Sequence, residues 1–301
     1  MLELTSVSPI LPASPIAAVN VASVPQRSPL RYPGGKTWLI PHIRAWLART
    51  SPLRLLVEPF AGGGIVSLTA VMEDLAEECL MIERDPDVAA FWRATLHHTS
   101  DLIERIRGFT PSREEIEHLT HEQPRDIVQR GFRTLVLNRT RRGGVLAPGA
   151  ALTRNGENGA GVASRWYANT LVRRLMAISR YAHRINFLEG DGMNEIGALR
   201  RRSDEGVAFF VDPPYTGSGG KRAGTRLYAY NDVDHPRLFS LLAVAGIDFV
   251  MTYDRSDEIQ RLIGQHGFHA VEVLMRNGHH NTLPELVITP YPVFTGGAPV
   301  G

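Results

Sequence analysis

Residues 53–64 read Leu-Arg-Leu-Leu-Val-Glu-Pro-Phe-Ala-Gly-Gly-Gly. The apolar run over residues 53–59 predicts a strand buried on both faces, as in a parallel sheet covered by helices. A glycine-rich turn at residues 61–64 and a helical pattern over residues 65–76 follow it. Such a turn lets a ligand approach the backbone beside a helix N-terminus, where N–H groups lack partners. The stretch therefore predicts an α/β fold with a ligand site at the end of a strand.

The segments around this stretch alternate between strand and helix patterns. Strands are also expected at residues 79–83, 185–188, 207–212, 249–253, 269–275 and 286–289. Helices are expected at residues 41–48, 86–97, 235–245 and 256–266. This alternation favours a doubly wound, mostly parallel sheet with covering helices.

A long basic segment interrupts the alternation at residues 100–183. Helical patterns over residues 101–138 and 165–184 flank a glycine-rich loop at residues 139–164. Residues 123–184 hold 12 arginines and two acids, a local charge of +10 in a chain of net charge +2. Such a block favours a localised polyanion site, because the arginine fork binds phosphates and base edges. A solvated helical face is the alternative, although Phe132, Trp166 and Tyr167 favour nucleic acid.

The composition is that of a globular protein. The chain has 301 residues, is 43% hydrophobic and 21% charged, and contains no apolar run long enough to cross a membrane. Its one cysteine, Cys79, cannot form an internal disulfide or a cysteine-only zinc site, so a reducing, cytoplasmic location is expected. The histidine pairs at residues 97–98 and 279–280 lack partners at metal-binding spacing, so no catalytic metal is expected.

These patterns divide the chain into four parts. Residues 1–26 are small, apolar and rich in proline and serine, which indicates a mobile leader. Residues 27–99 and 184–293 are expected to form one discontinuous domain, and residues 100–183 a helical insertion. Residues 294–301 are expected to form a loose tail.

Residues 31–37 read RYPGGKT, a second glycine-rich stretch before a helix. A phosphate-binding P-loop would need a glycine where Leu30 stands, and a preceding strand. The turn at residues 62–64 is likewise no dinucleotide fingerprint, because Ser67 occupies the position of the third glycine. A plain turn that opens a helix remains the alternative for residues 31–37.

Asp212-Pro213-Pro214-Tyr215 directly follows the apolar run at residues 207–211. An aspartate at the carboxyl end of a buried strand lies where open α/β sheets bind ligands. The two prolines stiffen the turn and lack N–H groups, which leaves carbonyl oxygens to accept hydrogen bonds. Together with the ring of Tyr215, these groups suit a planar ligand that carries an NH2 group. A loop-start aspartate beside a packed tyrosine is the alternative.

In this order, GGK at residues 34–36, EPFAGGG at 58–64 and DPPY at 212–215 resemble the Dam-like adenine-N6 DNA methyltransferases. NRT at 138–140, followed by two glycines, resembles the segment that leaves the family's recognition insertion. EGD at 189–191 resembles its acidic turn, and ELVI at 285–288 its antiparallel closing strand. The resemblance spans residues 28–290. It implies a Rossmann-like, S-adenosylmethionine-dependent methyltransferase sheet with a mainly helical DNA-recognition insertion.

The resemblance also implies S-adenosylmethionine as the cofactor and assigns roles to the matching positions. The residues implied to bind the cofactor are Tyr32, Gly34, Lys36, Glu58, Phe60, Gly62, Gly64, Glu83, Asp85, Asp191 and Asp212. Glu83 would hold the ribose hydroxyls, with Asp85 as its rival, and Asp191 would contact the adenine of the cofactor. The residues implied to handle the target base are Asp212, Pro213, Pro214 and Tyr215.

The implied reaction is methyl transfer to the N6 amino group of adenine in duplex DNA. The lone pair of that nitrogen is delocalised into the ring, so acceptors at Asp212 and Pro213 would draw it toward tetrahedral geometry. The base must leave the duplex to react, and Tyr215 would stack on it. No covalent nucleophile is required.

Two basic clusters are expected to contact the DNA. Arg139, Arg141 and Arg142 lie in a glycine-flanked turn, which predicts contacts to phosphates or base edges. Lys221 and Arg222 lie in the glycine-rich stretch at residues 216–226, which is expected to close over the base or the DNA backbone.

Other functions remain open at this stage. A cytosine-N4 DNA methyltransferase or an RNA methyltransferase would use a similar site, and a non-catalytic DNA-binding protein could keep the same scaffold. A cognate restriction endonuclease, as in restriction-modification, is compatible with the sequence but not required.

Overall fold

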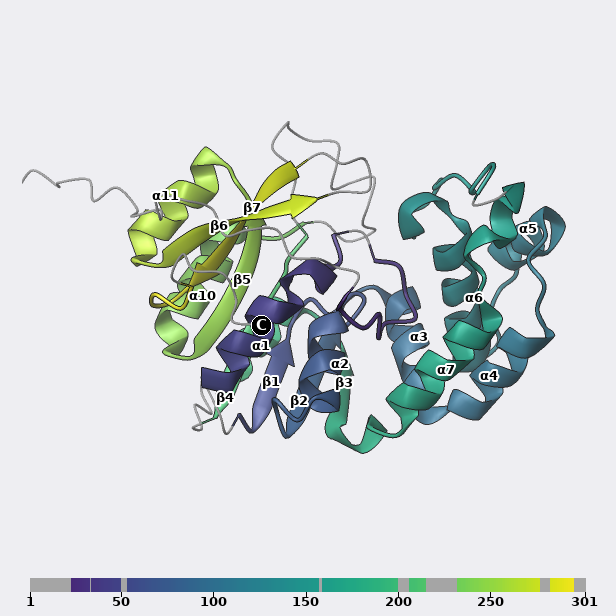
Figure 1. Cartoon of the computed structure of the whole chain (residues 1–301), viewed down its shortest axis with the longest axis horizontal. Helices are drawn as coiled ribbons and strands as arrows, with labels where there is room; N and C mark the ends of the chain where they lie inside the picture. The colour runs from purple at the N-terminus through teal and green to yellow at the C-terminus, as the bar shows by residue number, and fades with distance from the viewer. Residues whose placement is uncertain are drawn as a thin grey trace, which may run out of the picture.

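The computed structural model describes residues 23–32, 34–49, 53–156, 159–199, 206–214, 232–276 and 282–294. Within these residues, seven strands form one sheet in the order β3-β2-β1-β4-β5-β7-β6 (Figure 1). The strands are β1 (Leu55–Glu58), β2 (Glu78–Glu83), β3 (Ile185–Glu189), β4 (Val207–Val211), β5 (Asp248–Asp254), β6 (His269–Arg276) and β7 (Thr282–Thr289). Strands β1 to β5 pair in parallel, whereas β7 runs antiparallel between β5 and β6. The expected mostly parallel sheet and its antiparallel closing strand are confirmed.

Helices cover both faces of this sheet. The first face packs against α1 (Ile40–Arg49), α2 (Ile65–Met72) and α3 (Pro86–His97). The second face packs against α8 (Gly192–Leu199), α10 (His235–Ala245) and α11 (Asp257–His266). Successive residues of each strand alternate between the two cores: Phe210 and Val250 lie in the first, Phe209 and Phe249 in the second. This two-residue alternation is what allows a strand without polar residues to be buried on both sides.

A separate group of helices lies beyond α3, on the right of Figure 1. It comprises α4 (Thr99–Gly108), α5 (Arg113–His121), α6 (Ile127–Thr140) and α7 (Ala168–Ser179). Helix α6 crosses α3 closely at Gly131, where a Cβ atom would lie 2.9 Å from the carbonyl oxygen of Ala90. The absence of a side chain at this position therefore sets how near the two helices approach.

Short 3-10 turns occupy part of the stretch expected to be a loop at residues 139–164. These are η3 (Arg142–Gly144) and η5 (Gly161–Arg165), and a further turn, η6 (Ala182–Arg184), precedes β3. Before the sheet begins, η2 (Lys36–Leu39) leads into α1. Helix α8 was not expected, because residues 192–199 are too short and too rich in glycine and alanine to show a clear helical period.

Strand β7 begins at Thr282 rather than at residue 286. Pro284 argues against a strand at this position, because proline cannot donate to a sheet ladder. However, β5 pairs only with residues 285–288 of β7, so Pro284 has a paired neighbour only in β6. The proline is tolerated because, at this position, the side of β7 toward β5 has no paired strand residue that needs its N–H group.

Candidate active site

A cavity of about 530 Å³ opens at the carboxyl ends of β1, β2 and β4. The strand order reverses between β1 and β4, and open α/β sheets bind ligands at such a switch point. The expected cofactor and catalytic residues that line the cavity are Tyr32, Lys36, Glu58, Phe60, Gly62, Gly64, Glu83, Asp85, Asp191, Asp212 and Pro214. Three sequence motifs that lie far apart in the chain thus meet around one cavity.

Three carboxylates reach this cavity from neighbouring strands. Glu58 ends β1, Glu83 ends β2, and Asp212 follows β4. Each lies two residues after a side chain of the first core, namely Leu56, Met81 and Phe210, so all three continue the same sheet face. That face is also the one covered by the N-terminal segment that contains Tyr32 and Lys36. The cavity is therefore strongly acidic on its sheet side.

The glycine turn after β1 makes close contacts that no other residue permits. Gly62 and Gly64 have φ angles of +47° and +62°, in the left-handed region. A Cβ atom on Gly62 would lie 2.6 Å from the ring of Tyr32, and one on Gly64 would lie 2.5 Å from Met81. The turn is held in place by Trp92, whose Nε1 donates to the carbonyl oxygen of Gly62 at 2.9 Å.

Glu58 is buried beneath this turn. Its Oε2 accepts hydrogen bonds from the backbone N–H and the hydroxyl of Ser67, in the first turn of α2. Burial raises the pKa of Glu58 to about 8, although the bonds from Ser67 partly oppose the shift. The protonated form of this carboxyl group is therefore favoured unless a cation lies nearby.

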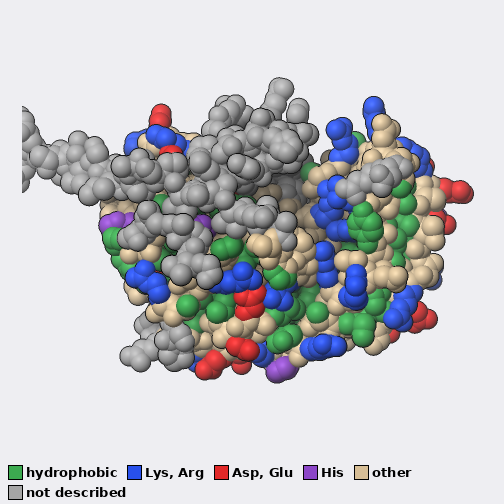
Figure 2. All heavy atoms as spheres, viewed as in Figure 1, with side chains coloured by type: hydrophobic (Ala, Val, Ile, Leu, Met, Phe, Trp, Pro, Cys, Tyr) green, Lys and Arg blue, Asp and Glu red, His purple; other side chains and the backbone are tan. Residues whose placement is uncertain are grey.

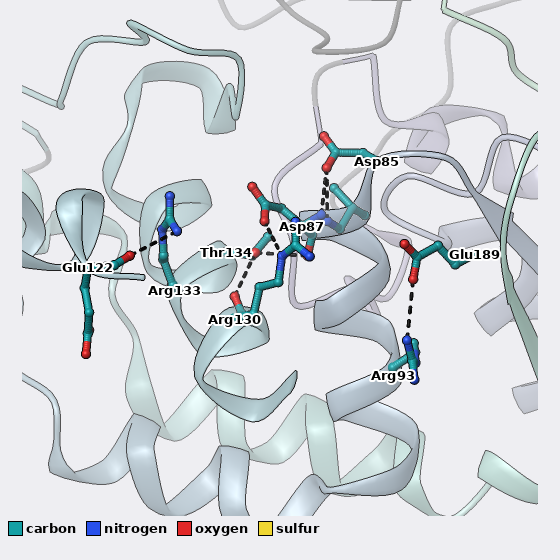
Figure 3. Close-up of polar contacts among 9 residues, drawn as sticks. Asp85, Asp87, Arg93, Glu122, Arg130, Arg133, Thr134 and Glu189 are labelled. Atoms are coloured by element: carbon teal, nitrogen blue, oxygen red, sulfur yellow. Dashed lines mark hydrogen bonds and ion pairs between the residues drawn. The ribbon is translucent and has the colours of Figure 1, made fainter. Parts of the chain in front are cut away.

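Glu83 and Asp85 have different surroundings. Glu83 is buried, and its two oxygens accept from the backbone N–H groups of Gly62 at 2.9 Å and Asp85 at 2.8 Å. Burial raises the pKa of Glu83 to about 7. Asp85 instead caps α3, where its Oδ1 accepts from the N–H groups of Asp87 and Val88 (Figure 3). Both carboxylates line the cavity, Glu83 with both oxygens bonded to backbone N–H groups and Asp85 with one oxygen engaged in the helix cap.

Asp212 is fixed through one of its oxygens. Its Oδ1 accepts a hydrogen bond from Thr252 Oγ1 at 2.7 Å and lies 2.9 Å from Lys36 Nζ. Lys36 Nζ also donates to the carbonyl oxygen of Gly34 at 2.7 Å and lies 3.1 Å from Glu285 Oε1 in β7. The side chain of Asp212 is still 23% exposed and lines the cavity. The carboxylate is thus both oriented and accessible.

Thr252 and Glu285 were not among the expected site residues. Glu285 carries a sequence signal nonetheless, because it is a single acid at the start of an otherwise apolar strand pattern. Thr252 stands between apolar residues of β5 and gives no comparable signal.

Asp191 begins α8 beside the cavity. Its Oδ1 accepts the N–H of Met193 at 2.9 Å, and its Oδ2 lies 3.9 Å from the exposed Arg84. A Cβ atom on the next residue, Gly192, would overlap with the carbonyl oxygen of Pro59. The absence of this atom lets the start of α8 approach the residue that directly follows β1.

The three clustered arginines differ in burial. Arg139 and Arg141 are buried, and each donates to a backbone carbonyl, Arg139 to that of Arg165 and Arg141 to that of Leu146. Burial and neighbouring arginines lower the pKa of Arg139 to about 10. Arg142 is exposed on the same turn. Only Arg142 therefore presents its side chain to solvent, whereas Arg139 faces the cavity.

The helical part supplies a basic wall opposite the carboxylates. Arg139, Arg165 and Arg174 of the helical part line the cavity, and Arg31 of the N-terminal segment lies beside them in the lining. Figure 2 shows basic side chains along the edge of the helical part that faces the sheet. Arg174 Nη1 donates to the carbonyl oxygen of Ser28 at 2.7 Å, which ties α7 to the N-terminal segment. The cavity is thus acidic toward the sheet and basic toward the helices.

Polar contacts join the helical part to α3. Arg130 Nε lies 2.7 Å from Asp87 Oδ1, and Thr134 Oγ1 donates to the carbonyl oxygen of Asp87 at 2.9 Å (Figure 3). Asp87 belongs to the first turn of α3, which follows the end of β2 after a short turn. The helix that carries Asn138 and Arg139 is therefore attached next to the carboxyl end of β2.

Some expected site residues fall elsewhere. Gly34 and Pro213 are described but do not line the cavity. Tyr215, Lys221 and Arg222 lie outside the described residues, as does most of the expected leader. Across the described chain, no helix combines the length and apolar character needed to cross a membrane. Nor do the described residues include three or more His, Cys, Asp or Glu side chains grouped to hold a metal ion.

Comparison with known proteins identifies a family. The model of the D12 class N6 adenine-specific DNA methyltransferases matches residues 32–277. A search of curated proteins found no match.

Solved structures give weaker likenesses. An S-adenosylmethionine-dependent methyltransferase from Agrobacterium tumefaciens is 12% identical, with a TM-score of 0.41; the match covers 85% of this chain and 62% of that protein. The rRNA methyltransferase AviRa from Streptomyces viridochromogenes is 17% identical, with a TM-score of 0.38 and 84% of each chain covered.

The family match includes the GGK segment, the glycine turn and the DPPY segment, and it extends over most of the chain. The chain therefore belongs to the D12 class N6 adenine-specific DNA methyltransferase family.

Proposed function

We propose that Asp212 receives the N6 amino group of an adenine extruded from duplex DNA. The family gives the activity class, S-adenosylmethionine-dependent methylation of adenine in DNA. The observation that carries the proposal is the fixed orientation of Asp212, whose Oδ1 is bound by Thr252 and Lys36 at the cavity wall. A carboxylate held in this way accepts a hydrogen bond without first reorganising, which is what electrostatic preorganisation requires.

The residues around the cavity fit S-adenosylmethionine. The cavity volume of about 530 Å³ lies within the range of roughly 300–1,000 Å³ typical of ligand sites. Buried carboxyl groups with raised pKa values, at Glu58 and Glu83, favour a cationic ligand, because a positive charge offsets the penalty of burying their anions. The ammonium and sulfonium groups of the cofactor supply that charge. Bound S-adenosylmethionine provides a methyl group that the sulfonium has already activated.

We propose that Glu83 holds the ribose hydroxyls and that Glu58 and the turn at residues 60–64 surround the rest of the cofactor. Tyr32 supports the turn through its contact with Gly62. Asp191, at the start of α8, is proposed to contact the cofactor's adenine.

At the target base, Asp212 and the carbonyl oxygen of Pro213 are proposed to accept the two N6–H bonds. Both acceptors draw electron density toward the nitrogen and direct its lone pair at the methyl carbon. With S-adenosylmethionine bound, the nitrogen would take the methyl group from the sulfonium, the sulfur would leave as a neutral thioether, and the nitrogen would then lose one proton to water. Tyr215 is proposed to stack on the extruded base.

The helical part, residues 100–183, is proposed to recognise the DNA target. Its basic wall and the exposed Arg142 offer contacts to phosphates, which fix position along the duplex. Lys221 and Arg222 are proposed to add contacts close to the extruded base. Duplex DNA is thus the proposed macromolecular partner, and a cognate restriction endonuclease is compatible with this function.

Methyl transfer to duplex DNA tests the proposal. Labelled S-adenosylmethionine is incubated with DNA, and the DNA is digested to nucleosides that are separated by mass. We expect N6-methyladenine from the wild type and a loss of about 10²-fold or more with Asp212→Asn. Asp74→Asn makes the same chemical change at an exposed position away from the cavity and serves as the control. A product other than N6-methyladenine, or full activity of Asp212→Asn, would overturn the proposal.

A further inference from the structure

One buried ammonium group at the cavity wall lies between two carboxylates. Lys36 Nζ is 2.9 Å from Asp212 Oδ1 and 3.1 Å from Glu285 Oε1. The side chains of Lys36 and Glu285 are only 2% and 3% exposed, whereas that of Asp212 is 23% exposed and lines the cavity. Glu285 therefore touches Lys36 but lies behind it, and it does not line the cavity.

From this arrangement we infer that Lys36 and Glu285 are positioning residues for Asp212. Lys36 holds Oδ1 of Asp212 in one place, and Glu285 holds the ammonium group of Lys36. The inference rests on the proposed function, in which Asp212 receives the amino group of adenine. Glu285 thus acts on the site through Lys36, although it does not itself line the cavity.

The charges explain why a second carboxylate is needed. A lone lysine beside Asp212 would cancel the negative charge of that carboxylate. With Glu285 present, the three groups keep a net charge of −1 at the place where the amino nitrogen becomes positive during transfer. Glu285 also pairs with the buried ammonium group of Lys36. Burying that charge without such partners would be strongly unfavourable.

The sheet topology brings these groups together. Glu285 lies opposite Asp254 in the β5–β7 ladder, and Val287 lies opposite Thr252, the other partner of Asp212. Strand β5 thus carries Thr252, which contacts Asp212 directly. The neighbouring strand β7 carries Glu285, which contacts Lys36, the other partner of Asp212. Glu58, Tyr253 and Asp254 also interact electrostatically with Asp212, and Asp254 interacts with Lys36 as well.

A double-mutant cycle on methyl transfer tests the inference. We expect Glu285→Gln to lower kcat by about 10- to 100-fold while the Kd for S-adenosylmethionine changes less than about twofold. Lys36→Met should lower kcat further, and Lys36→Arg should restore part of it. If Glu285 acts through Lys36, adding Glu285→Gln to Lys36→Met causes no further loss, because the two residues form one unit. Additive losses, or an unchanged kcat in Glu285→Gln, would overturn the inference.

Glu272→Gln is the matched control. Glu272 lies on the adjacent strand β6 and pairs with Arg255 at 2.7 Å, so the change also removes a carboxylate from an ion pair. It does not contact Lys36, and we expect wild-type kcat. A wild type that does not methylate adenine would contradict the proposed function itself. An active wild type with an unaffected Glu285→Gln would contradict only the present inference.

Lysine side-chain NMR gives a readout that is independent of turnover. The chain has only two lysines, Lys36 and Lys221, so labelling with 15N-lysine yields two ammonium signals. We expect the ammonium of Lys36 to exchange slowly with water in the wild type, and to shift and exchange faster in both Glu285→Gln and Asp212→Asn. Fast exchange in the wild type, or a Lys36 signal unchanged in both variants, would contradict the inference. Thermal unfolding of each variant confirms that it is folded.

Discussion

The side-chain amide of Asn138 binds both polar groups of the Arg31 backbone. Oδ1 accepts the N–H of Arg31 at 2.7 Å, and Nδ2 donates to its carbonyl oxygen at 2.9 Å and to that of Gly144 at 2.8 Å. Asn138 is fully buried near the end of α6. The helical part is therefore attached directly to the segment that carries Tyr32 and Lys36.

Loss of this amide should weaken the whole protein. Asn138→Ala leaves the backbone groups of Arg31 without their partner, which typically costs about 1–3 kcal/mol for buried polar groups. We expect a lower free energy of unfolding in denaturant titrations and reduced methyl transfer. Asn169→Ala, at an exposed position of α7, is the control and should change neither. An Asn138→Ala protein as stable as the wild type would show that water replaces these bonds fully.

Alanine substitutions at Gly144 and Gly149 separate two effects of a missing side chain, namely the close approach of another segment and the positive φ angle. Both have a φ angle of +77°, so alanine strains the backbone equally at either position, by about 1–2 kcal/mol. A Cβ atom on Gly144 would overlap with the carbonyl oxygen of Arg31, whereas one on Gly149 meets nothing within 4 Å. We expect Gly144→Ala to lower the midpoint of thermal unfolding considerably more than Gly149→Ala. Equal effects would mean that residues 31 and 144 move apart at little energetic cost.

The stability of the ligand-free protein should fall as pH rises. Burial raises the pKa of Glu58 to about 8 and the pKa of Glu83 to about 7, from an ordinary value of 4.5. Above pH 4.5 the unfolded chain loses protons that the folded chain keeps, so unfolding becomes easier until about pH 8. Each group contributes a slope of at most about 1.4 kcal/mol per pH unit. Denaturant titrations at several pH values measure this slope.

Replacing one of these carboxyl groups should flatten that dependence. Glu58→Gln cannot titrate, and the slope between pH 4.5 and 8 should become smaller. Glu114→Gln, on the exposed face of α5, should leave the slope unchanged. A slope in Glu58→Gln equal to that of the wild type would show that Glu58 does not hold its proton in the folded state.

Arg142 and Arg141 should respond differently to mutation. Arg142→Ala removes an exposed charge, so we expect weaker DNA binding and a salt dependence whose slope falls by about 0.9 for each lost phosphate contact. Arg141→Ala should instead reduce stability, because Arg141 is buried and donates to the carbonyl oxygen of Leu146 at 3.1 Å. Fluorescence anisotropy at several salt concentrations measures the first effect and thermal unfolding the second. An unchanged salt slope for Arg142→Ala would contradict the phosphate contact.

The parts of the fold set by local patterns could be predicted from the sequence. The run at residues 53–59 and the one at residues 207–211 form buried strands because their apolar residues suit both faces of a sheet. Asp212 and Glu58 were placed at strand ends for the same reason, and the structure brings both to one cavity. The turn glycines were also recognisable, since few other residues adopt a positive φ.

The remaining features depend on contacts between distant segments. The sequence alone does not show that Arg139 and Arg141 are buried, because an arginine-rich turn looks the same whether its side chains reach carbonyl groups or solvent. The ion pair between Lys36 and Glu285 depends on β7 inserting beside β5, a pairing with no local signal. The sequence also does not show that Asp85 caps α3 while Glu83 binds the N–H groups of Gly62 and Asp85, because these contacts are a matter of side-chain geometry.

The position of β7 also affects when the enzyme becomes competent. Lys36 precedes every strand of the described sheet, and Glu285 belongs to the strand that follows all the others. During synthesis on the ribosome, Glu285 is therefore made only after the other strands of the described sheet, long after Lys36. A chain released before β7 would contain β1 to β5 and Asp212, but it would lack Glu285, the second carboxylate beside Lys36. The group of Asp212, Lys36 and Glu285 is therefore complete only once the last strand of the described sheet has been made.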